Sequence, residues 1–312
     1  MKKISVIIPC WNEEEALPIY YNKMCEMMEQ MTEVKFELLF VDDGSTDDTL
    51  IFLRGLNKKD PRCRFFSFSR NFGKEAAIYA GLKNVQGGDF VAIMDVDMQD
   101  PPELLPEMYY ILQSEGYDCV GAKRSNRVGE PRIRSYLSEK FYKVINRISK
   151  IEIVRGARDY RVFNMKVMNA VIEMGEYNRF SKGLFEWVGF RTKWLEYDNV
   201  ERSAGDTKWT IWKLFLYSLE GITSFSAVPL SFAAVTGLLF CVVSFFMVLF
   251  IVVRTLIWGD PVSGWPSLVC IIFLVGGIQL FCTGILGHYL SKIYMETKHR
   301  PIFIMKESSD EL

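Results

Sequence analysis

Short apolar runs alternate with longer amphipathic stretches through residues 1–205. The apolar runs, typical of buried strands, are 4–9, 36–41, 65–68, 90–94 and 118–122. The longer stretches predict helices over 13–31 and 74–83, a helix capped by Thr46 or Asp47, and a helix opened by Pro101-Pro102-Glu103. Strands that alternate with helices in this way predict an α/β domain with a mostly parallel sheet.

Acidic residues follow two of the predicted strands. Asp42 and Asp43 end the second strand, and Asp95 and Asp97 end the fourth. Ligands of open α/β sheets bind beyond the carboxyl ends of the strands, so these acids are expected to meet in one site. Each pattern also has an ordinary interpretation: an Asp-Gly turn after the second strand, and loop acids after the fourth. The functional interpretation is a carboxylate that binds a nucleoside, and acids that with Gln99 hold a hard divalent cation.

Two apolar stretches near the C-terminus are long enough to cross a bilayer. Residues 227–253 and 267–290 contain no charged side chain, and each exceeds the roughly 20 residues that span the hydrocarbon core. The alternative is a pair of buried core helices. A link with Trp258 and Trp265 at its ends separates them, which favours a helical hairpin. Lys and Arg are concentrated outside the hairpin, which predicts that both of its ends are cytoplasmic.

Two further segments are candidates for contact with the membrane: one directly precedes the hairpin, and the other is rich in Lys and Arg. Residues 207–225 place Trp209 and Trp212 on one helical face, which indicates an interfacial helix or a helix that packs on the domain. Residues 132–150 are basic, either as a solvated face or as a surface, around Arg134, that attracts a lipid phosphate. The predicted organisation is a catalytic domain, an interfacial helix, two transmembrane helices and a cytoplasmic tail: 1–205, 206–226, 227–290 and 291–312.

Charge, histidine and cysteine usage exclude several classes of protein. The net charge of the 312 residues is -1, so nothing indicates a nucleic-acid partner. The only histidines are His288 and His299, which excludes a Ser-His-Asp triad and a histidine-rich metal site in the N-terminal domain. The cysteines form no CxxC pair and are expected to be reduced thiols. Acid-base chemistry in this domain therefore depends on carboxylates.

The order of the motifs resembles a known family. The chain shows Ile8-Pro9 to Asn12-Glu13, then VDDGST, RNFGKEAAIYAGL, MDVDMQDPPE, and finally GILG before KHRP. In this it resembles the large inverting glycosyltransferase family with a GT-A fold. Within that family it is similar to the polyprenyl-phosphate glycosyltransferases, such as dolichyl-phosphate mannose synthase and, more closely, the bactoprenol glucosyltransferases. The resemblance covers nearly the whole chain and implies a GT-A domain with an interfacial helix and a transmembrane hairpin.

The resemblance also implies roles for individual residues. Residues expected to line the donor-nucleotide pocket are Pro9, Asn12, Glu13 or Glu14, Asp42 and Asp95. Residues expected to hold Mg²⁺ or Mn²⁺ are Asp97, Gln99 and Asp95. Residues expected to bind the donor or acceptor phosphates are Arg124, Arg134, Arg202 and Lys208. Asp95 and Asp97 are thereby expected to serve catalysis at the donor diphosphate.

Asp159 matches the acid of the family's GDFR motif and completes the expected catalytic set. It is a candidate base or a residue that positions the acceptor, since a lipid phosphate needs little deprotonation. The alternative is a surface acid paired with Arg158 or Arg161. Two departures are visible: Arg158 stands where the family often has Gly, and Thr207 where Ser is usual.

The implied reaction is inverting transfer of a sugar from a nucleotide donor to undecaprenyl phosphate at the cytoplasmic membrane face, for later modification of a cell-envelope glycan. UDP-glucose is the first expectation for the donor, with UDP-N-acetylglucosamine or GDP-mannose as alternatives. A flippase and a downstream transferase are expected partners, and the hairpins are expected to pack into a homo-oligomer. A processive polysaccharide synthase lacks support because no QxxRW motif is present. An inactive membrane scaffold lacks support because the acids are retained.

Overall fold

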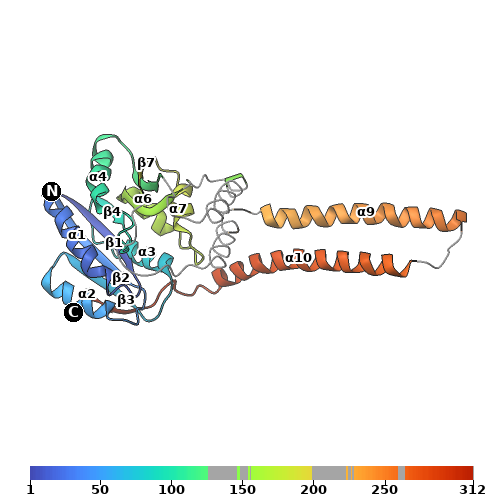
Figure 1. Ribbon diagram of the computed structural model, residues 1–312, viewed down its shortest axis with the longest axis horizontal. Coiled ribbons are helices and arrows are strands. Elements are labelled where there is room, and N and C mark those ends of the chain that lie inside the picture. Colours follow the sequence, from blue (N-terminus) through green and yellow to red (C-terminus); the bar gives the residue numbers. More distant parts are fainter. Residues whose placement is uncertain are drawn as a thin grey trace. The chain divides into compact units, whose positions relative to one another are not determined.

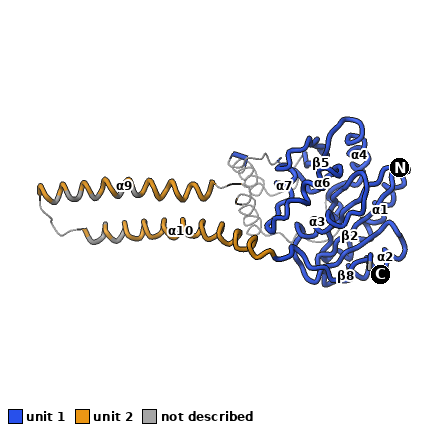
Figure 2. The backbone as a smooth tube through the Cα atoms, turned by 180° about the vertical axis from the view of Figure 1, so that it is seen from behind, with its two compact units in different colours: residues 1–221, 300–312 blue, residues 222–299 orange. Residues whose placement is uncertain are grey.

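The computed structural model describes residues 1–125, 146–147, 154, 156–198, 223, 226, 228–258 and 264–311. The chain forms two compact units, one of residues 1–221 with 300–312 and the other of residues 222–299 (Figure 2). Most of the expected interfacial helix 206–226 and of the basic segment 132–150 lies outside the described residues.

A mixed sheet forms the first unit, with helices on both faces (Figure 1). Among the described residues its strand order is β7-β5-β6-β4-β1-β2-β3-β8. The neighbours β4, β1, β2 and β3 run parallel, as do β5 and β7, whereas β6 and β8 are antiparallel to their neighbours. The strands are β1 Lys2–Cys10, β2 Val34–Asp42, β3 Cys63–Phe68, β4 Phe90–Ile93, β5 Cys119–Arg124, β6 Ala157–Asn164, β7 Thr192–Tyr197 and β8 Met305–Ser308. The predicted α/β class with a mostly parallel sheet is confirmed.

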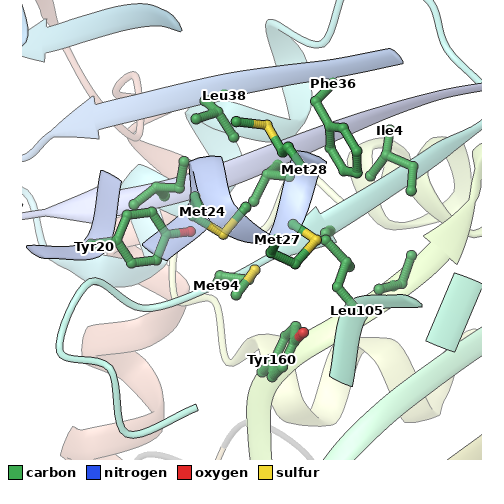
Figure 3. Packing of buried hydrophobic residues seen from close by; sticks show 14 of the residues in the cluster. Ile4, Tyr20, Met24, Met27, Met28, Phe36, Leu38, Met94, Leu105 and Tyr160 are labelled. Carbon is green, nitrogen blue, oxygen red and sulfur yellow. The ribbon is translucent and has the colours of Figure 1, made fainter. Parts of the chain in front are cut away.

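Helices cover the sheet in two layers because successive strand residues point to opposite faces. The helices of this unit are α1 Ala16–Gln30, α2 Thr49–Lys59, α3 Lys74–Lys83, α4 Leu105–Ser114, α6 Met165–Glu173 and α7 Ser181–Trp187, with short 3₁₀ turns η1 Pro102–Leu104 and η2 Ser309–Glu311. On one face, Leu38 belongs to a buried cluster that also contains Met24 and Met27 of α1 and Leu105 of α4 (Figure 3). On the other face, Leu39 belongs to a buried cluster that also contains residues of α3, α6 and α7.

Gly81 allows α3 to approach the sheet closely. A Cβ atom added there would lie 2.3 Å from Cγ2 of Ile7, so any larger residue would displace the helix. The start of α3 at Lys74 is thereby held against the end of the parallel strands, where the acids are found.

Several elements differ from the sequence prediction. The N-cap position of α2 is Asp48 rather than Thr46 or Asp47, because α2 begins at Thr49. Asp47 nevertheless accepts from the Thr49 N–H at 3.1 Å, and Thr46 and Asp47 also bind the loop after β1, through Asn12 and Glu14 respectively. Strands β6, β7 and β8 were not predicted. Strand β8 shows that the C-terminal tail pairs with β3 of the first unit.

The second unit contains two long helices, α9 Val228–Trp258 and α10 Trp265–Thr297. They contact each other near Ala233, whose carbonyl oxygen lies 3.8 Å from Sγ of Cys282, and the Tyr289 hydroxyl donates to the Ser226 carbonyl at 2.6 Å. Val228–Met247 and Ile271–Thr297 are long and apolar enough to cross a membrane. Large apolar side chains on both are exposed, for example Phe250 at 61% and Phe273 at 77%. The two apolar segments are thus not packed inside the described part of the chain.

Candidate functional site

The described site residues lie at one edge of the sheet. Strands β1, β2, β3 and β4 are parallel and end at this edge, and the antiparallel β6 begins there. Strand β5 is antiparallel to β6 and therefore ends there as well. This topology brings together residues that are distant in sequence, such as Asn12, Asp42, Asp95, Arg124 and Asp159.

The loops after β1 and β2 are joined by hydrogen bonds. The Asn12 backbone N–H donates to Oγ of Ser45 at 2.9 Å, and Oδ1 of Asn12 accepts from the Thr46 N–H at 2.8 Å. Asn12 has a φ of 54°, a left-handed conformation that asparagine tolerates better than most residues. Pro9 lies beside Val41 in the register of β1 and β2. The loop after β1 is thus fixed to the loop after β2.

The acids expected at the nucleoside have defined partners. Asp42 is buried and accepts from the Ser45 N–H at 3.0 Å and from the Ser67 hydroxyl at 2.7 Å. The Glu13 N–H donates to Oγ1 of Thr49 at 2.9 Å. Glu14 accepts from the Asp48 N–H at 2.9 Å. Asp42 is therefore oriented by β2 and β3 together. Glu13 and Glu14 instead take part in the hydrogen bonds that join the loop after β1 to the loop after β2.

Lys74 joins Asp95 to Asp159. In the register of β4 and β6, Ile93 lies beside Arg161, so two residues further along Asp95 comes beside Asp159. The Lys74 Nζ lies 2.7 Å and 2.8 Å from the two carboxylate oxygens of Asp95 and 2.6 Å from Oδ2 of Asp159. One ammonium thus holds two carboxylates that come from different strands.

Lys74 also determines the charge of Asp159. Burial acts to raise the pKa of Asp159, but Lys74 together with Lys182 and Arg161 outweighs it, and the pKa lies well below its usual range. The two carboxylates conversely hold the pKa of Lys74 above its ordinary value, against its burial. Asp159 is thus a carboxylate and Lys74 an ammonium across the physiological pH range. The alternative of Asp159 as a surface acid paired with Arg158 or Arg161 is wrong, because its ion-pair partner is Lys74.

The acids after β4 form a turn that presents oxygen atoms. Oδ1 of Asp97 accepts from the Gln99 N–H at 3.2 Å across Met98, which has a φ of 56°. The Gln99 side-chain oxygen accepts from the guanidinium of Arg124 at 3.0 Å. No cluster of three or more histidine, cysteine or acidic residues suited to a metal occurs among the described residues. Asp95, Asp97 and Gln99 carry carboxylate and amide oxygens, which are hard ligands of the type that Mg²⁺ or Mn²⁺ accepts.

Arg158 lies within the site. Its Nε is 2.8 Å from Oδ1 of the buried Asp100, and its guanidinium is 3.8 Å from Oδ2 of Asp95. The Tyr197 hydroxyl donates to the same oxygen of Asp100 at 2.5 Å. The residue that departs from the family's usual Gly therefore adds a second cation beside Asp95.

The sequence prediction located part of this site. Arg134, Arg202 and Lys208 lie outside the described residues. Lys74 was missed as a site residue, although it stands in the RNFGK block just before a predicted helix that follows a strand. Asp43 was predicted to lie beside Asp42 at the end of the second strand but was given no role, and the structure shows which backbone groups it binds.

Comparison with known proteins identifies the class to which this fold and site belong. The profile of Glycosyl transferase family 2 matches residues 5–172, more than half of the chain. The chain belongs to this family and is a glycosyltransferase.

Relatives are similar to this chain along its full length. It is 41% identical over 309 residues to the bactoprenol glucosyl transferase of Shigella phage SfV, covering 99% of this chain and 100% of that one. It is 40% identical over 306 residues to the putative glycosyltransferase CsbB of Bacillus subtilis, covering 98% of this chain and 92% of the relative. Among solved structures, a glucosyl-3-phosphoglycerate synthase from Mycobacterium tuberculosis matches with a TM-score of 0.45 and 20% identity, covering 71% of this chain and 78% of that one.

Proposed function

We propose that this glycosyltransferase moves glucose from UDP-glucose to a polyprenyl phosphate, with inversion at the anomeric carbon. The observation that carries the proposal is the Lys74-bridged pair Asp95 and Asp159 at the carboxyl edge of the sheet. The full-length similarity to bactoprenol glucosyl transferases supports the sugar and the lipid acceptor. The donor nucleotide binds beside Asn12 and Asp42, where the loops after β1 and β2 are joined.

The chemistry requires few groups from the protein. The acceptor phosphate is ionised near neutral pH, so one of its oxygens attacks the anomeric carbon without a strong base. Asp159 is paired with an ammonium at 2.6 Å, which makes it a weak base. We therefore assign it a positioning and electrostatic role at the carbon that gains positive charge in the transition state. Orientation of the two substrates and fixed charges account for most of the rate in such a displacement.

We propose that Asp97, Asp95 and Gln99 supply oxygen ligands to a divalent cation. When bound, Mg²⁺ or Mn²⁺ would neutralise charge that develops on the departing nucleotide diphosphate. Asp97 is the principal protein ligand in this proposal, because it matches the metal-holding acid of the family's motif. Arg124, Arg134, Arg202 and Lys208 are proposed to bind the donor or acceptor phosphates.

Association with the membrane follows from the second unit and from the acceptor. The exposed apolar helices α9 and α10 suit a lipid surrounding, and a polyprenyl acceptor resides there. The segments before and after the two helices belong to the same compact unit, so the chain leaves this unit for the helices and returns to it afterwards. We propose that both helices span the membrane and that the catalytic unit and both termini are cytoplasmic.

A transfer assay tests the proposed reaction. Membranes containing the full chain are incubated with undecaprenyl phosphate, radiolabelled UDP-glucose, UDP-N-acetylglucosamine or GDP-mannose, and Mg²⁺ or Mn²⁺. Label from UDP-glucose should enter the organic phase and be lost when EDTA is present. Label from another donor alone would replace glucose as the transferred sugar. No organic-soluble label from any donor would overturn the lipid acceptor.

A further inference from the structure

A buried carboxylate, Asp43, binds the backbone just before α3. It follows the last residue of β2 and is 4% exposed. Its oxygens accept from the Phe72 N–H at 2.6 Å and from the Gly73 N–H at 2.9 Å and 3.2 Å. Burying a carboxylate destabilises the fold unless hydrogen-bond donors surround it. The N–H groups of Phe72 and Gly73 are such donors for Asp43.

This turn determines where α3 begins. Gly73 is the N-cap of α3 with a φ of 98°, a conformation that other residues rarely adopt. Its carbonyl accepts from the Ala77 N–H at 3.2 Å, which starts the helical hydrogen bonds. The N–H groups at a helix start need partners outside the helix, and Asp43 supplies one for Gly73. The position and direction of the first helical residue are thereby coupled to β2.

That first residue is Lys74. Its neighbour Glu75 accepts from the Ser181 N–H at 2.9 Å and from the Ser181 hydroxyl, which fixes the opposite side of the helix start to α7. Lys74 lies between these two anchors, so its long side chain starts from a fixed backbone position. From there the ammonium reaches both Asp95 and Asp159.

We infer that Asp43 is a positioning residue of the transfer site, which acts by holding the turn at Gly73 so that Lys74 joins Asp95 to Asp159. The inference rests on the proposed function for its consequence in catalysis. Asp43 touches neither substrate nor reacting atoms in this account. Displacement of the turn by about 1 Å moves the ammonium out of one of its two ion pairs, and displacements of this size cost rate.

A double-mutant cycle separates this role from general destabilisation. Asp43→Asn keeps the side-chain shape but can no longer accept both N–H groups as a carboxylate, and Lys74→Met removes the ammonium. Asp43→Asn should lower kcat by about 10-fold, and donor KM should change by less than about 3-fold. The variant carrying both changes should be no slower than Lys74→Met within about 2-fold, because the two residues act in series. A double variant whose decrease in kcat equals the product of the two single decreases would overturn the inference.

Glu37→Gln is the matched control. Glu37 is a buried carboxylate of β2, the strand that Asp43 follows, but it accepts from the Ser5 hydroxyl at 2.5 Å and from Arg64 at 2.6 Å. Any decrease in kcat caused by Glu37→Gln should multiply with the decrease caused by Lys74→Met, because Glu37 does not act through Lys74. Gly73→Ala is a second route to the same displacement, because the residue added at this φ strains the turn while no atom lies within 4 Å of its Cβ. The chain with both Gly73→Ala and Lys74→Met should likewise have a kcat close to that of Lys74→Met alone.

Hydrogen exchange gives a readout that does not depend on activity. The Phe72 and Gly73 amides should be protected in the wild-type chain and should exchange faster in Asp43→Asn, with no change in Glu37→Gln. Unchanged protection in Asp43→Asn would overturn the inference whatever the kinetics. A wild-type chain that transfers no sugar would instead contradict the proposed function, and the exchange result would still decide whether Asp43 holds the turn.

Discussion

Asp43 illustrates at the residue scale how a buried carboxylate can serve a site without reaching it. Burial raises its pKa to about 6, while the Phe72 and Gly73 N–H groups act in the opposite direction, as does Arg70. The neighbouring Asp42 adds to the increase. The folded chain therefore holds this proton more tightly than the unfolded chain, whose carboxyl titrates near its ordinary 3.8.

This shift predicts a pH dependence of stability. Because the folded pKa is higher, the Asp43 contribution to the free energy of unfolding falls as pH rises from about 4 to about 6, by at most about 3 kcal/mol. Asp43→Asn removes this titration. Thermal unfolding of both proteins in detergent at pH 4, 5 and 7 should show the variant gaining stability relative to wild type as pH rises. Parallel pH curves would contradict the assignment.

The ion pair of Arg158 and Asp100 makes a second prediction at this scale. Arg158→Met leaves the buried Asp100 with the Tyr197 hydroxyl and no cation, so the free energy of unfolding should fall by about 3 kcal/mol. Adding Asp100→Asn to the same chain should recover most of this loss, because no buried charge then remains unpaired. Urea or thermal unfolding checks both variants. Equal stability of Arg158→Met and of the variant that also carries Asp100→Asn would contradict this prediction.

Individual site residues were predictable to different degrees. Asp95, Asp97 and Asp42 could be placed because parallel strands end at one edge of a sheet. The neighbourhood of Asp159 could not be derived from periodicity, because it depends on the antiparallel register of β6 against β4. Lys74 was missed because a lysine at a helix start has no distinctive pattern until the partners of its ammonium are known.

At the scale of elements, the parallel core was predicted best. Strands β1 to β4 overlap the mainly apolar runs 4–9, 36–41, 65–68 and 90–94, and the helix predicted over 74–83 matches α3. Strand β8 was missed because its sequence, MKES, has no apolar run and gains its partner only from β3. The N-cap position of α2 was misplaced by one or two residues, because the helix begins only at Thr49. Asp47 binds the Thr49 N–H with one carboxylate oxygen and the Glu14 N–H of the loop after β1 with the other.

The tail is predicted to stabilise the catalytic unit. Phe303 stacks on Phe68 with ring centroids 5.0 Å apart, and the Ser69 N–H donates to the Ile304 carbonyl at 3.0 Å. Phe303→Ala should lower the free energy of unfolding by about 2 kcal/mol through lost packing. Ile304→Ala is the control, because that side chain is 52% exposed and its loss should cost under about 0.5 kcal/mol. Equal effects in thermal unfolding would mean that the tail does not pack on β3.

At the scale of the whole molecule, the chain enters and leaves the second unit from a single folded unit. An even number of membrane crossings follows if α9 and α10 both span. An alkaline phosphatase reporter inserted in the link 259–263 should be active, whereas the same reporter after the last residue should be inactive and a green fluorescent protein there should fluoresce. Phosphatase activity at the C-terminus would contradict the proposed topology.

Transfer by the purified full chain in vesicles that contain undecaprenyl phosphate tests the central claim most directly. Wild type is compared with Asp97→Asn, Asp159→Asn and the control Asp89→Asn, whose carboxylate lies before β4 and binds Lys2 at 2.6 Å. Wild type and the control should convert radiolabelled UDP-glucose into organic-soluble label at similar rates, and each site variant should be slower by about 100-fold or more. Equal rates in all four proteins would show that the reaction does not occur at this edge of the sheet.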